Sequence, residues 1–221
     1  MSDDFQLRVF DPNEDISVIE RQLPHWGQSG TICFITFRTH DSMPRSVVEN
    51  WRRDRMLWLR RHNVDPTGSN WQSVFEKLDA ISQKEFHEIF SRRWQQELDK
   101  CHGPCVLRRR ELAEIVAKSL EHFDGERYEL TDYVVMPNHV HVMAAFVNEK
   151  GMLDQCESWK HYTATRINRR LNCKGRFWQQ DGFDHLVRSV EQFEYLRKYI
   201  RDNPVKAGLR GEEYVHYSKD I

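Results

Sequence analysis

The chain has 221 residues, with 39% hydrophobic and 12% aromatic content and a formal net charge of −1. This length and apolar content predict a globular chain with a real core, one domain carrying an insertion. The near-zero charge argues against a uniformly basic nucleic-acid binder, and no apolar run is long enough to span a membrane. The acidic N-terminus lacks the apolar core of a signal peptide, and the five cysteines have no regular spacing, so we expect a reducing cytoplasm.

The sequence predicts both strands and helices. In chain order we expect a strand at 31–38, a helix at 45–62 and a helix from 82 that begins with a capping box at Ser82–Glu85. A helix at 107–122 and two strands at 127–136 and 139–147 follow, and then a helix at 152–171, a strand at 183–188 and a helix at 190–202. Without residues 45–105 this is the order of a ferredoxin-like α+β fold, an antiparallel sheet with helices packed on one face. Residues 45–105 form a helical insertion after the first strand, and 1–28 form an acidic arm.

Charge is distributed unevenly along this order. Residues 1–29 hold six acidic and two basic residues, whereas residues 159–210 hold twelve Lys and Arg against five Asp and Glu. A basic C-terminal half suits an anionic partner, although a solvated charged surface explains it equally well.

His139-Val140-His141 lies in a run of strand-forming residues. Alternate side chains of a strand point to the same face, so the two imidazoles share a face and Val140 points into a core. Paired imidazoles can bind a divalent metal, although two histidines in an isolated His-x-His motif more often face water. The turn residues Pro137 and Asn138 place the pair at the start of a strand, at the end of the sheet, where a substrate can reach it.

Tyr195, Tyr199 and Asn203 are spaced by four residues and lie along one side of the last predicted helix. A tyrosine hydroxyl can act as a covalent nucleophile, and an amide oxygen one turn later can bind a metal. Taken alone, the tyrosines fit better as half-buried packing residues. Pro204 disfavours helical geometry at Asn203, so the helix should end there.

Two sequence motifs together point to a protein family more specifically than either motif does alone. Met136-Pro137-Asn138-His139-Val140-His141-Val142 and Tyr199-Ile200-Arg201-Asp202-Asn203-Pro204 resemble the single-tyrosine transposases of the His-hydrophobic-His class, and within it the REP-associated tyrosine transposases. The resemblance implies that His139 and His141 bind metal and that Tyr199 is the nucleophile. It further implies that Asn203, at a position where some members have Gln, supplies a third ligand to Mg²⁺ or Mn²⁺. Tyr195 is a competing nucleophile without the following Asn-Pro.

The function that this resemblance implies is cleavage and strand transfer of single-stranded, hairpin-bearing DNA through a 5′-phosphotyrosine, by a monomer or a homodimer in the cytoplasm at the nucleoid. A bound metal would neutralise the scissile phosphate. The alternatives are a catalytically silent DNA hairpin-binding protein and a metallohydrolase of small phosphoesters. DNA-backbone contacts are predicted for basic side chains on the last two helices, namely Lys160, Arg166, Arg169, Arg170, Lys198 and Arg201. Cys101 and Cys105 lack the second ligand pair of a structural zinc site.

Overall fold

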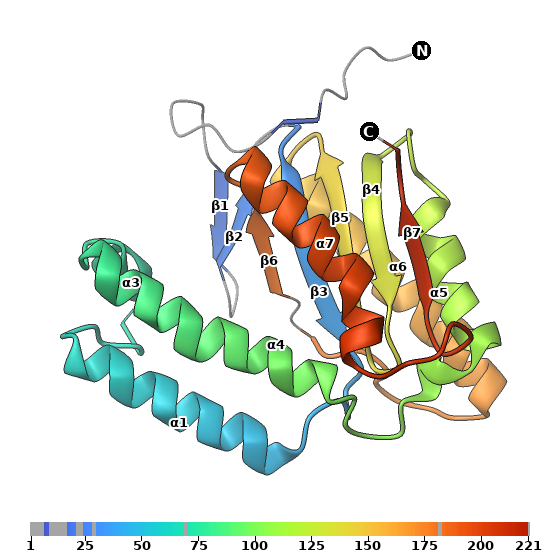
Figure 1. Cartoon of the computed structure of the whole chain (residues 1–221), viewed down its shortest axis with the longest axis horizontal. Coiled ribbons are helices and arrows are strands. Elements are labelled where there is room, and N and C mark those ends of the chain that lie inside the picture. The colour runs from blue at the N-terminus through green and yellow to red at the C-terminus, as the bar shows by residue number, and fades with distance from the viewer. Residues whose placement is uncertain are drawn as a thin grey trace. The chain divides into compact units, whose positions relative to one another are not determined.

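The structure is a computed structural model that describes residues 7–8, 17–20, 24–27, 30–68, 70–180 and 183–220. The chain divides into two compact units. The sheet unit contains Met1–His40 and Pro104–Ile221, and the helical unit contains Asp41–Gly103 (Figure 1). The predicted acidic arm lies mostly outside the described residues. Among the described helices, none is both long and apolar enough to cross a membrane.

A five-stranded antiparallel sheet is the centre of the sheet unit. Its strand order is β6-β3-β5-β4-β7, and its strands are β3 (Ile32–Arg38), β4 (Tyr128–Val135), β5 (His139–Phe146), β6 (Phe183–Leu186) and β7 (Val215–Ser218). The predicted α+β antiparallel fold is confirmed. The short edge strand β7 was not predicted. A separate two-stranded sheet pairs β1 (Ser17–Glu20) with β2 (Pro24–Gly27).

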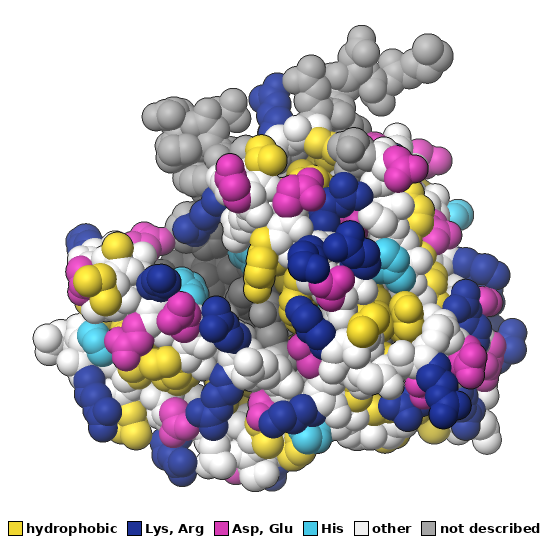
Figure 2. All heavy atoms as spheres, in the orientation of Figure 1, with side chains coloured by type: hydrophobic (Ala, Val, Ile, Leu, Met, Phe, Trp, Pro, Cys, Tyr) yellow, Lys and Arg dark blue, Asp and Glu magenta, His cyan; other side chains and the backbone are white. Residues whose placement is uncertain are grey.

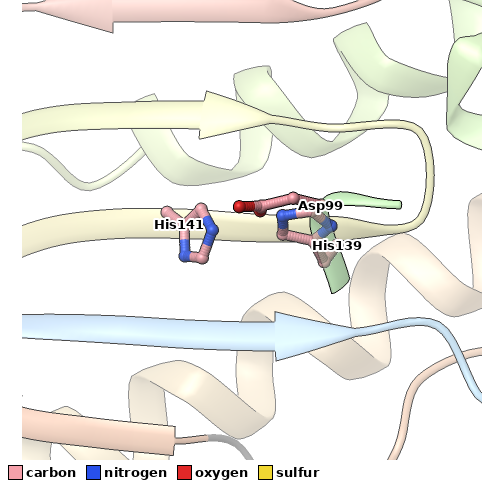
Figure 3. Close-up of side chains that lie close together, drawn as sticks. All are labelled: Asp99, His139 and His141. Atoms are coloured by element: carbon pink, nitrogen blue, oxygen red, sulfur yellow. The ribbon is translucent and has the colours of Figure 1, made fainter. Parts of the chain in front are cut away.

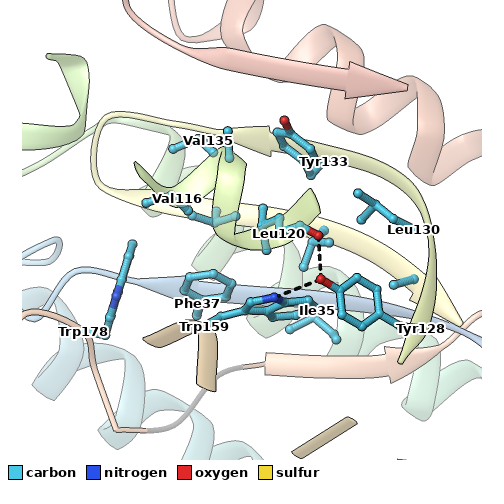
Figure 4. Close-up of a cluster of buried hydrophobic side chains, with 14 of the residues drawn as sticks. Ile35, Phe37, Val116, Leu120, Tyr128, Leu130, Tyr133, Val135, Trp159 and Trp178 are labelled. Atoms are coloured by element: carbon cyan, nitrogen blue, oxygen red, sulfur yellow. Dashed lines mark hydrogen bonds between the residues drawn. The ribbon is translucent and has the colours of Figure 1, made fainter. Parts of the chain in front are cut away.

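Two helices cover one face of this sheet. They are α5 (Arg110–Glu121), preceded by the short 3₁₀ helix η2 (Val106–Arg108), and α6 (Glu149–Leu171). Their apolar side chains pack with Val140 and the other core-facing residues of β3, β4 and β5. Inside this core the Tyr128 hydroxyl donates to the Leu120 carbonyl at 2.7 Å and accepts from Trp159 Nε1 at 3.3 Å (Figure 4). These two bonds give the buried Tyr128 hydroxyl and the Trp159 indole N–H their partners.

The third helix, α7 (Val190–Lys206), covers the opposite face, as Figure 1 shows. Phe193, Leu196 and Ile200 pack there against a second apolar cluster that includes Phe34 and Met143. The prediction that helices pack on one face only is therefore wrong. The alternate residues of β3, β4 and β5 include apolar side chains on both faces, so both faces need a cover.

Helix α7 continues past the predicted end at Asn203 and includes Pro204. A proline in a helix removes one backbone hydrogen bond and crowds the carbonyl one turn earlier, but Pro204 does so only in the last turn of α7. Here the Gly208 amide donates to the Val205 carbonyl at 3.0 Å and the Leu209 amide to the Pro204 carbonyl at 2.9 Å. Gly208 has φ +68, so the helix is stopped by a left-handed glycine in a Schellman motif.

The helical unit contains α1 (Arg45–Arg61), α2 (Trp71–Phe75), α3 (Ala80–Phe86), the π-helical turn η1 (His87–Ser91) and α4 (Arg92–Asp99). Trp58, Leu59, Phe86 and Phe90 are part of its own apolar core. The predicted capping box at Ser82 is wrong, because Asp79 caps α3 instead. The Asp79 carboxylate accepts from the Ser82 amide at 2.9 Å and from the Ser82 hydroxyl at 2.7 Å. That the whole chain acts as one transposase-like domain stays a prediction.

Candidate functional site

The turn between β4 and β5 places the two histidines at the start of β5. The Met136 amide donates to the His139 carbonyl at 2.8 Å and closes the turn. His139 and His141 pair with Arg38 and Thr36 of β3, so they lie on the α7 face, while Val140 lies in the opposite core. Figure 3 shows both rings projecting from the same strand; Asp99, also drawn there, is part of the helical unit.

Both imidazoles are fully buried, with 0% exposure. Their ring centroids lie 4.7 Å apart. Burial lowers the pKa of His139 to about 3, helped by the charge of Arg38, and lowers the pKa of His141 well below its usual value, helped by His139. Both rings are therefore neutral at physiological pH, the form that carries the lone pair a metal needs. Helix α7 covers this face of the sheet, and that a substrate can reach the two histidines stays a prediction.

Each histidine has a defined partner at Nδ1. His139 Nδ1 lies 2.8 Å from the Asn138 side-chain oxygen Oδ1, and His141 Nδ1 lies 2.8 Å from Thr36 Oγ1. The Phe34 ring stacks on His141 with a centroid separation of 5.3 Å and an interplanar angle of 24°. These contacts fix the ring planes. Neither Thr36 nor Phe34 was singled out from the sequence, although their alternation along β3 places them on this face.

Tyr199 is the tyrosine of α7 that reaches the histidines. Its hydroxyl lies 3.4 Å from His141 Nε2, and the two ring centroids are 5.2 Å apart. Tyr195, the competing nucleophile, is 65% exposed. The difference arises because Leu196 and Ile200 are turned into the apolar cluster, and Tyr199 lies beside them. The geometry thus assigns Tyr199, not Tyr195, to the site.

Asn203 lies one turn after Tyr199 and is fully buried. Its backbone carbonyl accepts from the Ala207 amide at 3.0 Å. The structure therefore places the predicted third ligand on the helix that carries the tyrosine. That its amide oxygen binds a metal stays a prediction.

An ion pair anchors α7 to the sheet, and sequence reasoning missed it. Arg197 contacts the buried Asp132 of β4 at 3.2 Å. It also donates to the Ser218 hydroxyl at 2.8 Å and to the Lys219 carbonyl at 2.6 Å. The pair joins residues 65 positions apart, and no local pattern predicts such a contact. It holds the helix two residues before Tyr199.

The predicted DNA-binding residues fall into two groups. Lys198 and Arg201 are exposed on α7 and both pair with Asp202, at 2.6 Å and 3.4 Å; Figure 2 shows basic and acidic side chains mixed over this helix. The other four lie on α6, which covers the opposite face, and they are Lys160, Arg166, Arg169 and Arg170. Lys160 donates to the Gln180 carbonyl at 2.7 Å. The structure does not gather the six around one site.

Part of the chain matches a protein-family model. Residues 106–203 match the family model described as "Transposase IS200 like". Residues 106–203 are therefore similar to the IS200-like transposases, and we call them the IS200-like segment. The predicted resemblance is confirmed over that segment, which is less than half of the chain. It begins at η2, contains His139, His141 and Tyr199, and ends at Asn203.

Two further comparisons complete this result. Among solved structures, the chain matches a REP-associated tyrosine transposase bound to a REP hairpin, with 13% identity and a TM-score of 0.39, over 92% of this chain and 94% of the other. No curated protein sequence is significantly similar to the chain. The IS200-like segment leaves out β3, which supplies Thr36, and the whole helical unit.

Proposed function

We propose that the chain is a metal-assisted DNA endonuclease and strand transferase that attacks single-stranded, hairpin-bearing DNA with Tyr199. One observation supports this most: inside the IS200-like segment, the Tyr199 hydroxyl lies 3.4 Å from His141 Nε2. A tyrosine beside neutral paired imidazoles is suited to phosphodiester transfer through a covalent intermediate. A location in the cytoplasm at the nucleoid follows from such a substrate and stays a prediction.

In the proposed step, the Tyr199 oxygen attacks the scissile phosphorus and the bond from phosphorus to the 3′-oxygen breaks. The products are a 5′-phosphotyrosine and a free 3′-hydroxyl, and the proton lost by the tyrosine is balanced by the one gained by the 3′-oxygen. The phosphotyrosine keeps the energy of the broken diester. Attack by another 3′-hydroxyl on this phosphorus then releases Tyr199 and joins two strands without a nucleotide cofactor.

The residues present fit a divalent ion, Mg²⁺ or Mn²⁺. His139 and His141 are neutral, share one face and lie side by side, and Asn203 supplies an amide as a third ligand. Two imidazoles and one amide leave positions for phosphate oxygens and water. When bound, the ion would neutralise charge on the phosphate and polarise it.

Burial of the histidines restricts how DNA reaches them. Both rings are at 0% exposure, so a phosphodiester enters only when side chains over the α7 face move. Lys198 and Arg201, exposed on the same helix as Tyr199, are the proposed backbone contacts nearest to the nucleophile. The four basic residues of α6 are proposed as a second contact with the DNA, on the other side of the sheet.

The test is covalent capture on a denaturing gel. Wild-type protein with Mn²⁺ and a labelled oligonucleotide, a hairpin with a single-stranded flank, should give a band of protein joined to DNA. Tyr199→Phe should abolish the band and retain DNA binding, and the matched control Tyr195→Phe should keep both. Binding without an adduct in the wild type would favour the silent hairpin-binding protein. Hydrolysis of a small phosphoester without an adduct would favour the metallohydrolase.

A further inference from the structure

We propose that Asn138 and Thr36 are positioning residues, which hold His139 and His141 in the tautomer that presents Nε2 to a divalent ion. Each accepts a hydrogen bond from the Nδ1–H of one histidine. The inference deepens the proposed function and rests on it for the role of the ion. The hydrogen-bonding pattern itself depends only on the sheet unit and is testable without DNA.

The contact between Asn138 and His139 determines one tautomer. Asn138 Oδ1 lies 2.8 Å from His139 Nδ1, and both side chains are fully buried. An amide oxygen only accepts hydrogen bonds, so Nδ1 must carry the hydrogen. In a neutral ring Nε2 then carries the lone pair. Asn138 is itself held in place, because its carbonyl accepts from the Thr39 amide at 2.8 Å.

The contact between Thr36 and His141 crosses two paired strands. Thr36 and His141 are direct partners in the β3–β5 register, and Thr36 Oγ1 lies 2.8 Å from Nδ1 with Thr36 only 6% exposed. A hydroxyl can donate or accept. If it accepts, the lone pair of Nε2 faces the Tyr199 hydroxyl at 3.4 Å, and that hydroxyl can donate to it. The reverse arrangement would put a hydrogen on Nε2 and block metal ligation.

Removal of either acceptor has a direct consequence. A buried Nδ1–H without a partner is unfavourable, so the ring shifts toward the tautomer with the hydrogen on Nε2. Partners of this kind on metal-binding histidines typically change metal affinity about 10–100-fold when they are mutated. We expect that loss for Thr36→Val, which removes the hydroxyl and keeps the shape, and for Asn138→Ala.

The experiment uses full-length protein with ¹⁵N-labelled imidazoles, freed of metal by chelation. Nitrogen chemical shifts and couplings in NMR spectra report which ring nitrogen carries the hydrogen. In the wild type, His139 and His141 should both carry it on Nδ1. Titration calorimetry with Mn²⁺ alone should show about 10–100-fold weaker binding for Thr36→Val and Asn138→Ala. The conservative variants Thr36→Ser and Asn138→Asp, which keep an acceptor, should restore the wild-type tautomer.

A hydrogen on Nε2 of either ring in the wild-type spectrum would overturn the inference for that ring. So would wild-type Mn²⁺ affinity in Thr36→Val and Asn138→Ala. If those variants do not fold, the wild-type spectrum together with Thr36→Ser and Asn138→Asp still decides. Predicted tautomers in a protein that forms no DNA adduct would contradict the proposed function and leave this inference standing.

Discussion

Removal of Arg197 should destabilise the protein and loosen the helix that carries Tyr199. The side chain of Asp132 is 1% exposed and that of Arg197 20% exposed. Removing one partner of a buried ion pair costs about 3–5 kcal/mol. The Ser218 hydroxyl still donates to Asp132 at 2.5 Å, so the remaining carboxylate keeps one partner. We therefore expect Arg197→Met to lower the free energy of unfolding by about 3 kcal/mol, the lower end of that range.

Urea unfolding followed by circular dichroism measures this loss. The matched control is Arg201→Met, on the same helix, whose pair with Asp202 is exposed and should contribute little. Adduct formation by Arg197→Met should also fall, because Tyr199 loses its fixed position beside His141. A loss below about 1 kcal/mol, or one equal to that of the control, would refute the reasoning that this pair anchors α7.

Three further outcomes follow from the site. Replacing His139 and His141 together with Ala should remove cleavage that depends on Mg²⁺ or Mn²⁺; undiminished cleavage in metal-supplemented buffer would contradict their role. Mixing that double variant with Tyr199→Phe should restore no cleavage, because one chain supplies both parts of the site; restored cleavage would show that chains exchange tyrosines. In metal-free protein the folded pKa of His139, about 3, lies below the unfolded value of about 6.5. Between these two pH values the unfolded state therefore binds more protons than the folded state. The free energy of unfolding then falls with falling pH, by up to about 1.4 kcal/mol per pH unit. His139→Gln should flatten that slope in urea unfolding measured between about pH 4 and 6, and an unchanged slope would exclude His139 as its source.

Local patterns predicted the parts of the site that lie within one element. The alternation of β5 placed His139 and His141 on one face and Val140 in the core, as the strand register and the core show. The helical spacing of Phe193, Leu196 and Ile200 predicted a helix with a buried face, which α7 has. Periodicity reports such features because it depends only on neighbours in sequence.

Contacts between elements that lie far apart in the chain could not be predicted from local sequence patterns. Spacing by four residues grouped Tyr195 with Tyr199, yet only Tyr199 faces the sheet, because the docking angle of α7 decides which side is covered. The partners of the site, Thr36 and the ion pair of Arg197 with Asp132, join strands and helices far apart in the chain. Two other predictions were wrong although they depend on local sequence. Pro204 was expected to end α7, but the helix ends before Gly208, and Ser82 was expected to cap α3, but Asp79 caps it.

Tyr199 is proposed to form a covalent bond with DNA. The most direct measurement is mass spectrometry of the trapped adduct after protease and nuclease digestion, which identifies both the modified residue and the attached end of the strand. We predict a single modified peptide with a nucleotide joined through its 5′-phosphate to Tyr199. Attachment to Tyr195, attachment through a 3′-phosphate, or cleaved DNA without any modified tyrosine would contradict the account.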